Sequence, residues 1–203
     1  QTGELLARGD TVGVFQCEST GARHTLRQLG ARTVRDLAVA NAFFKPGPAT
    51  GGMAETFVRR YRGQESVTFL HPALAPILAA TQGVLLFQEQ ILRVATEIAG
   101  LSWTEANHLR RGMSKMDPLE MAQIQAQFEA GCQRPTTNVE RGRASEGPGF
   151  TPEQAHTLWQ QVVAFSGYGF NQGHATAYAD VSYRSAYLKA HWPAAFLCAR
   201  LAG

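Results

Sequence analysis

Helix start signals recur along this chain and constrain its fold more than any other feature. Ser102-Trp-Thr-Glu105 has the spacing of a capping box, in which the serine oxygen and the glutamate carboxylate each satisfy a free N–H at a helix start. Asp117-Pro118 and Thr151-Pro152 repeat the signal, because proline is favoured at the first helical position. We therefore predict helices that start at these three places, the second running to about Ala130 and the third to about Phe165.

Apolar side chains elsewhere also recur at helical spacing, which predicts further helices. The segments with this pattern are 22–29, 33–43, 53–62, 88–99, 175–190 and 193–201. The predicted buried side of the long helix comprises Ala175, Ala179, Tyr183, Ala186, Tyr187 and Ala190. Thr11–Cys17 alternates briefly and favours a short strand. The predicted fold class is mainly α, a multi-helix domain with little or no sheet, and the polar stretch 132–150 is predicted to be a long flexible surface loop.

The composition is that of an ordinary globular protein. With 203 residues, 44% of them hydrophobic and 17% charged, the chain can bury a core in one large or two small domains. The net charge is only +3, but the arginines cluster along the sequence. A locally basic face, and hence a polyanionic partner, is permitted by this pattern but not required.

Cysteine usage and hydropathy concern the cellular setting. Cys17, Cys132 and Cys198 are far apart and odd in number, which favours reduced, mostly buried thiols over disulfides. We find no signal peptide and no apolar run of membrane-spanning length, so no membrane partner is expected. Because the first residue is Gln, we expect the chain to be an excised piece of a longer protein.

The common catalytic motifs are absent from this sequence. Its four aspartates, Asp10, Asp36, Asp117 and Asp180, make no Asp-x-Asp or Asp-x-Glu pair that would hold two divalent metals. The nucleophile elbow, the Walker loop and the H-E-x-x-H zinc motif are also missing. We therefore predict no catalytic residue and no metal ligand within this chain.

One set of residues suited to binding lies on the predicted helix after Ser102. Arg110, Arg111 and Lys115 share a helical stripe and could clamp phosphate oxygens, since arginine offers a planar fork of donors and lysine a mobile charge. The alternative is a solvated basic face without a ligand.

A second set lies in the glycine-rich turn before the long helix. Tyr168, Gly169, Asn171 and His174 could hold a base and sugar through ring stacking and side-chain hydrogen bonds. The alternative is an ordinary glycine turn in which His174 caps the helix.

A third set combines Lys45, which opens Lys45-Pro-Gly-Pro48, with Arg59, Arg60 and Arg62 on the next predicted helix. These cations suit the phosphates of a nucleic-acid backbone. The alternative is an interhelix turn beside a solvated face. Gln88-Glu89-Gln90 is similarly ambiguous, because a polar triplet at a helix start either caps the helix or reaches a cleft.

The order of these blocks along the chain resembles the fingers region of the alpha subunit of bacterial DNA polymerase III, among the C-family DNA polymerases. The resemblance covers nearly the whole chain apart from residues 132–150. Its blocks are Gly13-Val-Phe-Gln-Cys-Glu-Ser19, Lys45-Pro-Gly-Pro48, Gly51-Gly-Met53, Gly83-Val-Leu-Leu-Phe-Gln-Glu-Gln90, Glu105-Ala-x-x-Leu-Arg-Arg-Gly-Met-Ser-Lys115, Phe165-Ser-Gly-Tyr-Gly-Phe-Asn171 with His174, and Ser182-Tyr-x-x-Ala-Tyr-Leu-Lys-Ala-His191.

The resemblance implies a part in templated DNA synthesis from deoxynucleoside triphosphates. Residues 1–203 would form a fingers domain, with 1–19 as the connection from a palm domain. That palm would hold Mg²⁺ on its aspartates, and its absence here implies that the isolated chain is inactive. Primer-template DNA would be a partner, as would a sliding clamp and other replisome subunits through regions outside this chain, all in the bacterial cytoplasm.

The resemblance also assigns the site residues. Arg110, Arg111 and Lys115 would face the triphosphate, and the Tyr168–His174 turn would face the base and sugar. The family commonly has lysine and serine at Gln172 and Gly173, a second lysine at Met116 and arginine at Lys45. Fewer cations near the nucleotide suggest an error-prone or divergent paralogue. Two other classes stay open: a non-catalytic nucleotide- or nucleic-acid-binding helical module, and a helical interaction domain whose basic face is incidental.

Overall fold

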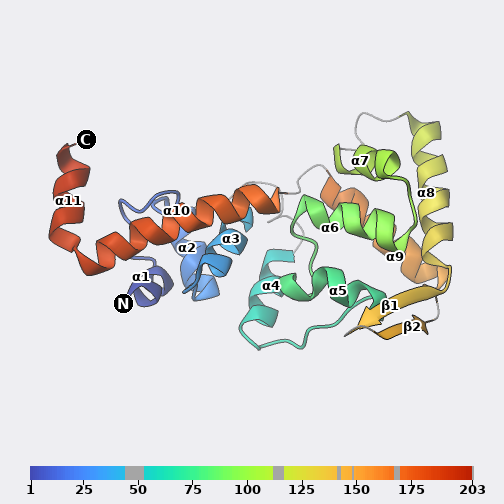
Figure 1. Ribbon diagram of the computed structural model, residues 1–203, viewed down its shortest axis with the longest axis horizontal. Helices are drawn as coiled ribbons and strands as arrows, with labels where there is room; N and C mark the ends of the chain where they lie inside the picture. The colour runs from blue at the N-terminus through green and yellow to red at the C-terminus, as the bar shows by residue number, and fades with distance from the viewer. Residues whose placement is uncertain (44–52, 112–116, 141–142, 148, 167–169, 203) are drawn as a thin grey trace. The chain divides into compact units, whose positions relative to one another are not determined.

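The computed structural model describes residues 1–43, 53–111, 117–140, 143–147, 149–166 and 170–202, and they form two compact units. The first unit combines residues 1–65 with residues 170–203, and the second is the continuous segment 66–169. Both are mainly helical, which confirms the predicted fold class (Figure 1).

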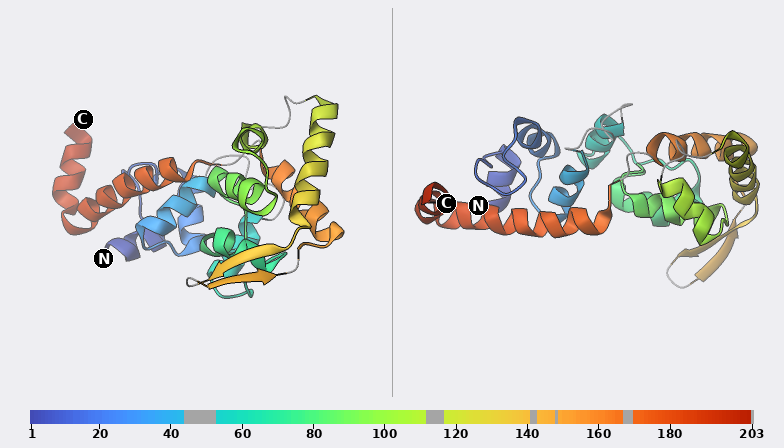
Figure 2. Two further views of the ribbon diagram at one scale, coloured as in Figure 1. Left: turned by 45° about the vertical axis from the view of Figure 1, so that its right-hand side comes forward. Right: turned by 90° about the horizontal axis from the view of Figure 1, so that it is seen from above.

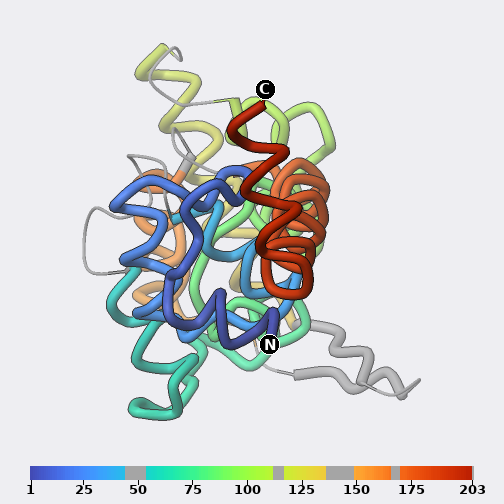
Figure 3. Tube along the Cα trace, turned by 90° about the vertical axis from the view of Figure 1, so that its left-hand side faces the viewer, coloured from blue at the N-terminus to red at the C-terminus, as the bar shows by residue number. Residues whose placement is uncertain are grey.

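The first unit is built around the long helix α10. Its helices are α1 (Thr2–Arg8), α2 (Thr20–Leu29), α3 (Val34–Phe43), α4 (Met53–Tyr61), α10 (Gln172–His191) and α11 (Pro193–Ala202). α10 packs against α3 and α1, and Figure 2 shows the three N-terminal helices along one side of it. Figure 3 looks nearly down α10 and shows the same arrangement. Leu6, Leu26, Leu37 and Phe57 are fully buried in this unit.

The second unit packs α6 against α7 and α8 against α9. Its elements are η1 (Pro72–Leu74), α5 (Ala75–Leu78), η2 (Ala79–Thr81), α6 (Gln88–Arg93), the π-helical turn η3 (Val94–Ile98), α7 (Trp103–Arg111), α8 (Pro118–Cys132), β1 (Thr136–Glu140), β2 (Arg143–Gly147) and α9 (Pro152–Ser166). Leu86, Ile91, Leu109, Phe128 and Leu158 form its core.

The three predicted helix starts are confirmed. The backbone N–H of Ser102 donates to the Glu105 carboxylate at 2.8 Å, and the Glu105 N–H donates to the Ser102 hydroxyl at 3.3 Å. Asp117 accepts from the Leu119 N–H at 2.7 Å. At the start of α9 the Thr151 N–H donates to the Gln154 side-chain oxygen at 2.9 Å, and the Gln154 N–H donates to the Thr151 hydroxyl at 3.2 Å.

The predicted strand at Thr11–Cys17 is wrong, because this segment closes on itself in turns. The Val14 N–H donates to the Thr11 carbonyl and the Cys17 N–H donates to the Val14 carbonyl. Lys189 of α10 holds the segment by donating to the carbonyls of Asp10 and Val12, both at 2.8 Å. Backbone groups satisfied in this way need no partner strand.

A β-ribbon occupies most of the stretch that the sequence predicted to be a loop. β1 and β2 are antiparallel, with Thr136 opposite Gly147 and Glu140 opposite Arg143. At the base of the ribbon the Phe150 N–H donates to the Cys132 carbonyl at 3.0 Å. The two strands are short, so the fold contains little sheet, as predicted.

The buried side of α10 consists of small residues. Ala175, Ala179, Ser182 and Ala186 are fully buried, whereas Tyr187 is 42% exposed. The prediction that Tyr187 is buried is therefore wrong, and Tyr183 and Ala190 of the predicted side are only half-buried. Adjacent residues on a helix are about 100° apart, so Tyr187 cannot share the side that Ala186 presents to the core.

Candidate functional site

The predicted phosphate clamp begins on α7. Ala106 and Leu109 are buried, so the other side of the helix carries Asn107, Arg110 and Arg111 toward solvent. The capping box fixes where the helix starts, and hydrogen bonds from the Ser102 hydroxyl and N–H hold the pKa of Glu105 below its usual value. Arg111 is the last residue of α7 and is exposed. Lys115 lies outside the described residues.

Arg110 is half-buried and is held by two neutral side chains. Its Nε donates to the Asn107 side-chain oxygen at 2.9 Å, one turn earlier on α7. Its Nη1 donates to the Gln88 side-chain oxygen at 3.2 Å, from the first residue of α6. The structure thus brings Gln88 to Arg110, a contact that the sequence did not reveal because the two residues belong to different helices.

The two glutamines of the Gln88-Glu89-Gln90 triplet have different environments. Gln90 is buried, and its oxygen accepts from the N–H groups of Leu86 and Phe87 at 2.8 and 2.9 Å. Its amide nitrogen donates to Thr81 at 2.6 Å. Gln90 therefore fixes the start of α6, while Gln88 is directed to the arginine.

The predicted base- and sugar-facing turn leads into α10. Asn171 caps this helix by accepting from the His174 N–H at 2.7 Å, so the cap is Asn171 and not the His174 side chain. The His174 ring is exposed and lies against Tyr178, with ring centroids 4.0 Å apart. Tyr168 and Gly169 lie outside the described residues.

Neighbouring rings extend this arrangement into a row. Phe170 contacts His174 edge-on at 5.4 Å between centroids, and Phe15 contacts Tyr178 at 5.5 Å. The spacing of His174 and Tyr178 by four residues could have indicated their contact, since such residues share one side of a helix, whereas Phe170 precedes α10. Phe15 comes from a distant turn and carries no such signal.

The arginines predicted to face the DNA backbone are engaged within the first unit. Arg59 and Arg60 both donate through Nε to Glu65, at 2.9 and 2.8 Å, and these bonds hold the pKa of Glu65 below its usual value. Arg62 donates to the carbonyls of Arg27 and Gln28, both at 2.8 Å, at the end of α2. Lys45 lies outside the described residues.

Tyr61 anchors the end of α4 to the start of α3. Its hydroxyl donates to the Asp36 carboxylate, which also accepts from the N–H groups of Arg32 and Thr33 at 2.7 and 2.9 Å. Burial and the bond to Asp36 raise the pKa of Tyr61 to about 12. α4 is therefore fastened to two neighbouring helices, α2 and α3.

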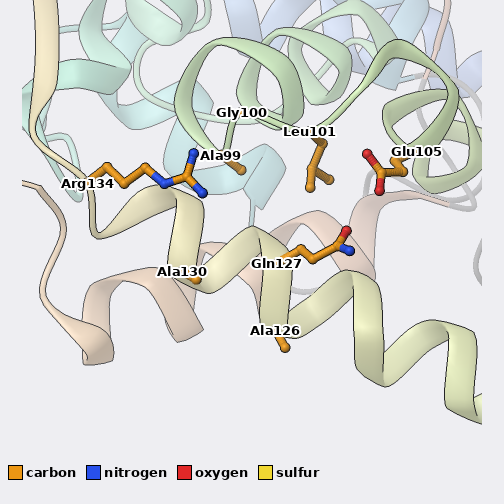
Figure 4. A pocket seen from close by; sticks show the side chains of 8 residues that line it. All are labelled: Ala99, Gly100, Leu101, Glu105, Ala126, Gln127, Ala130 and Arg134. Atoms are coloured by element: carbon orange, nitrogen blue, oxygen red, sulfur yellow. The ribbon is translucent and has the colours of Figure 1, made fainter.

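Each unit has a surface pocket with a volume of about 500 Å³. Figure 4 shows the one in the second unit, where Glu105 and Arg134 lie at opposite ends and Gln127 between them. Of the predicted site residues that the structure describes, none lines it. The pocket in the first unit lies between α2 and α4 and includes His24, Phe43 and Arg59.

The possible metal ligands and the cysteines among the described residues are further candidates for parts of a site. Within the described ranges no group of three or more His, Cys, Asp or Glu side chains could hold a metal ion. Cys17 and Cys132 are buried, and burial raises their pKa values to about 11 and about 12, so both thiols stay protonated near neutral pH. Cys198 is exposed. In the part of the chain that the structure describes, no helix is both long and apolar enough to cross a membrane.

The fold and these residues define a mainly helical domain with one basic helix end and one aromatic, asparagine-capped helix start. The family of the bacterial DNA polymerase III alpha subunit finger domain matches residues 1–136, and the chain belongs to this family. Alignments with curated relatives extend the similarity beyond residue 136 to nearly the whole chain.

Curated relatives include proteins named DNA polymerase III subunit alpha and others named error-prone DNA polymerase. The DNA polymerase III subunit alpha of Halalkalibacterium halodurans is 39% identical over 98% of this chain. The error-prone DNA polymerase of Corynebacterium jeikeium is 41% identical over 97% of it, and the DNA polymerase III subunit alpha of Thermus aquaticus is 39% identical over 99%. The chain spans 16% of the length of each of these three relatives.

Proposed function

We propose that this chain is the nucleotide-binding fingers part of a bacterial DNA-directed DNA polymerase. In this proposal Arg110, Arg111 and Lys115 bind the triphosphate of the incoming deoxynucleotide. Tyr168, Gly169, Asn171 and His174 face its base and sugar. The proposal is carried by the α7 arginines, because Arg110 is held by neutral amides and Arg111 is exposed beside it, in a chain of the polymerase III family.

The proposed role of the α7 arginines is electrostatic. Nucleotidyl transfer builds negative charge on the leaving pyrophosphate, and positioned guanidinium groups stabilise that charge. Arg110 and Arg111 supply the compensating positive charge without forming a covalent bond to the substrate. The exposed ring of His174, beside the half-buried rings of Phe170 and Tyr178, offers a surface on which a base can stack.

Primer-template DNA is the second proposed ligand. Lys45, Arg59, Arg60 and Arg62 would contact its phosphates, with Glu65 and the α2 carbonyls sharing the same guanidinium groups. A sliding clamp and other replisome subunits would bind regions of the polymerase outside this chain, in the bacterial cytoplasm.

Catalytic Mg²⁺ has no proposed ligands here. The described side chains do not form a cluster that fits the ion, so we place it on aspartates of a palm domain elsewhere in the protein. Mg²⁺ would there activate the attacking hydroxyl and neutralise phosphate charge. We accordingly propose that the isolated chain does not polymerise.

Arg111→Ala in the intact polymerase tests the proposal. We expect kcat/KM for nucleotide incorporation to fall by about 10²-fold, the scale of losing one preorganised charge contact, while the Kd for primed DNA changes by less than about threefold. Arg134→Ala, an exposed arginine at the end of α8, is the control. Equal losses in incorporation and in DNA binding would place Arg111 on the DNA backbone and contradict the proposal.

Salt dependence separates the remaining alternative. If this chain were a helical interaction domain with an incidental basic face, replacing its arginines by neutral residues would not alter DNA binding. Phosphate contacts release counterions, so the affinity of the polymerase for primed DNA should fall steeply with salt, and less steeply when Arg59 is replaced by alanine. An unchanged slope would argue for the interaction domain.

A further inference from the structure

Arg110 differs from the ion-paired arginines of this chain in what holds it. Arg93 pairs with Glu97 at 2.7 Å, Arg184 with Asp180 at 3.0 Å, and Arg200 with Glu18 at 3.6 Å. Among the residues that the structure describes, no carboxylate lies within ion-pairing distance of Arg110. A neutral acceptor orients a guanidinium without cancelling its charge, whereas a carboxylate does both.

The two acceptors come from different helices and engage different nitrogens. Asn107 of α7 accepts from Nε, and Gln88 of α6 accepts from Nη1. These contacts commit two of the five N–H groups of the guanidinium. A fork held at two nitrogens is fixed in direction as well as in place, so its remaining donors keep one orientation.

The position of Gln88 is itself fixed. Gln90, two residues later, is buried and bonded to the Leu86 and Phe87 N–H groups, to Thr81 and to the Ile77 carbonyl. Phe87 is also buried and directly precedes Gln88. The side chain that holds Arg110 therefore starts from a rigid helix end, and α6 packs directly on α7.

We propose that Gln88 and Asn107 are positioning residues that present Arg110, charged and pre-oriented, to the anionic substrate. The inference rests on the proposed function and deepens it, because it assigns residues that act on the triphosphate only through Arg110. A freely rotating arginine must lose side-chain entropy when the anion binds, and a pre-oriented one has lost it already. The neutrality of both acceptors keeps the full attraction for phosphate.

Gln88→Met and Gln88→Glu in the intact polymerase test this inference. Met keeps the size of Gln88 and removes the acceptor, so the KM for the deoxynucleoside triphosphate should rise about three- to tenfold. Glu keeps the acceptor but adds a negative charge beside Arg110, so KM should rise at least as much. Gln123→Met, at an exposed position of α8, is the matched control and should leave KM unchanged.

The comparison of the two variants separates positioning from packing. If Gln88 only supported the fold, Gln88→Glu would retain the wild-type KM because it keeps the size and the hydrogen bond, and that result would overturn the inference. Raised KM values in both variants, with melting temperatures within about 2 °C of wild type, support it.

A double-mutant cycle with Arg110→Ala completes the test. Once Arg110 is absent, Gln88→Met should have no further effect on KM, since the two residues act as one unit. A rise of the same size in both backgrounds would overturn the inference alone. If Arg110→Ala by itself left the triphosphate KM unchanged, Arg110 would not bind the triphosphate, and this inference would fall together with that part of the proposed function.

Discussion

Helices α4 and α7 both end in adjacent arginines but use them differently. On α4, Arg59 and Arg60 share Glu65, and nearby Arg62 binds the last carbonyls of α2. On α7, Arg110 is bonded to amides and Arg111 is exposed. Similar runs of cations thus lie in different electrostatic surroundings, because the α4 pair shares a carboxylate whereas Arg110 is held by neutral amides. The neighbours of an arginine, rather than the run itself, decide how much of its charge is already offset within the fold before a ligand binds.

Removing each pair of arginines should produce the largest contrast. In the intact polymerase, Arg110→Ala with Arg111→Ala should lower kcat/KM for the nucleotide by about 10²- to 10³-fold and change the Kd for primed DNA by less than about threefold. Arg59→Ala with Arg60→Ala should raise that Kd by about three- to tenfold and leave the triphosphate KM nearly unchanged. Steady-state incorporation and DNA titrations measure both, and similar effects on KM would remove the distinction between the helices.

Arg62→Met should destabilise the first unit. The guanidinium binds two carbonyls at the end of α2, where positive charge is favoured by the helix dipole, so we expect a loss of about 1–2 kcal/mol in the free energy of unfolding. Met keeps much of the aliphatic stem. Urea unfolding measures the change, and Arg8→Met, whose Nε lies 3.9 Å from Asp10 at an exposed position, is the control. Equal stability of the two variants would contradict the fastening role.

Tyr61→Phe should cost about 1 kcal/mol at neutral pH, because it removes the donor to Asp36 while keeping the ring stacked on Phe57. The pKa of Tyr61 is raised to about 12 in the folded chain, above the value near 10 of an unfolded tyrosine. Its contribution is therefore complete below about pH 10 and is lost as the pH rises toward 12.

Unfolding of wild type and Tyr61→Phe between pH 8 and about 11.5 checks this window. The stability difference should be constant at the lower values and shrink at the upper ones. Tyr187→Phe, at an exposed ring, is the control and should show no such trend. A difference that grows with pH would contradict the assigned hydrogen bond.

Arg59→Ala alone should have the smallest effect on stability. Its bond to Glu65 lies at the surface, where such pairs contribute little to stability and are screened by salt. Urea unfolding at low and high ionic strength should show a small difference that disappears in salt. A large, salt-independent loss would mean that α4 depends on this pair more than its exposure indicates.

Local signals in the sequence predicted much of the fold. The capping boxes at Ser102 and Thr151 are local, since donor and acceptor lie three residues apart, and both were found where predicted. The Thr11–Cys17 strand failed because Lys189, far along the chain, satisfies that backbone. The sequences of β1 and β2 show no alternation of apolar and polar residues, so the sequence does not distinguish these strands from a loop.

The candidate site was predictable only in part. Arg110 and Arg111 follow from helical spacing, and their helix was correctly placed. The contact of Gln88 with Arg110 joins two helices and depends on how α6 packs, which no local pattern records. The joining of the α7 arginines with the turn before α10 into one nucleotide site stays a prediction, since the two groups belong to different units.

The discontinuous first unit has a consequence for synthesis on the ribosome. Residues 1–65 emerge before residues 66–169, but α3 lacks its contact with α10 until that helix is made, after the whole of residues 66–169. The Asn41 side chain, which donates to the Ala175 carbonyl at 3.4 Å, must wait for the same event. The inserted second unit can complete its own contacts in the meantime. A nascent chain stalled before Phe170 would therefore hold α1 and α3 without the helix that covers them in the folded unit.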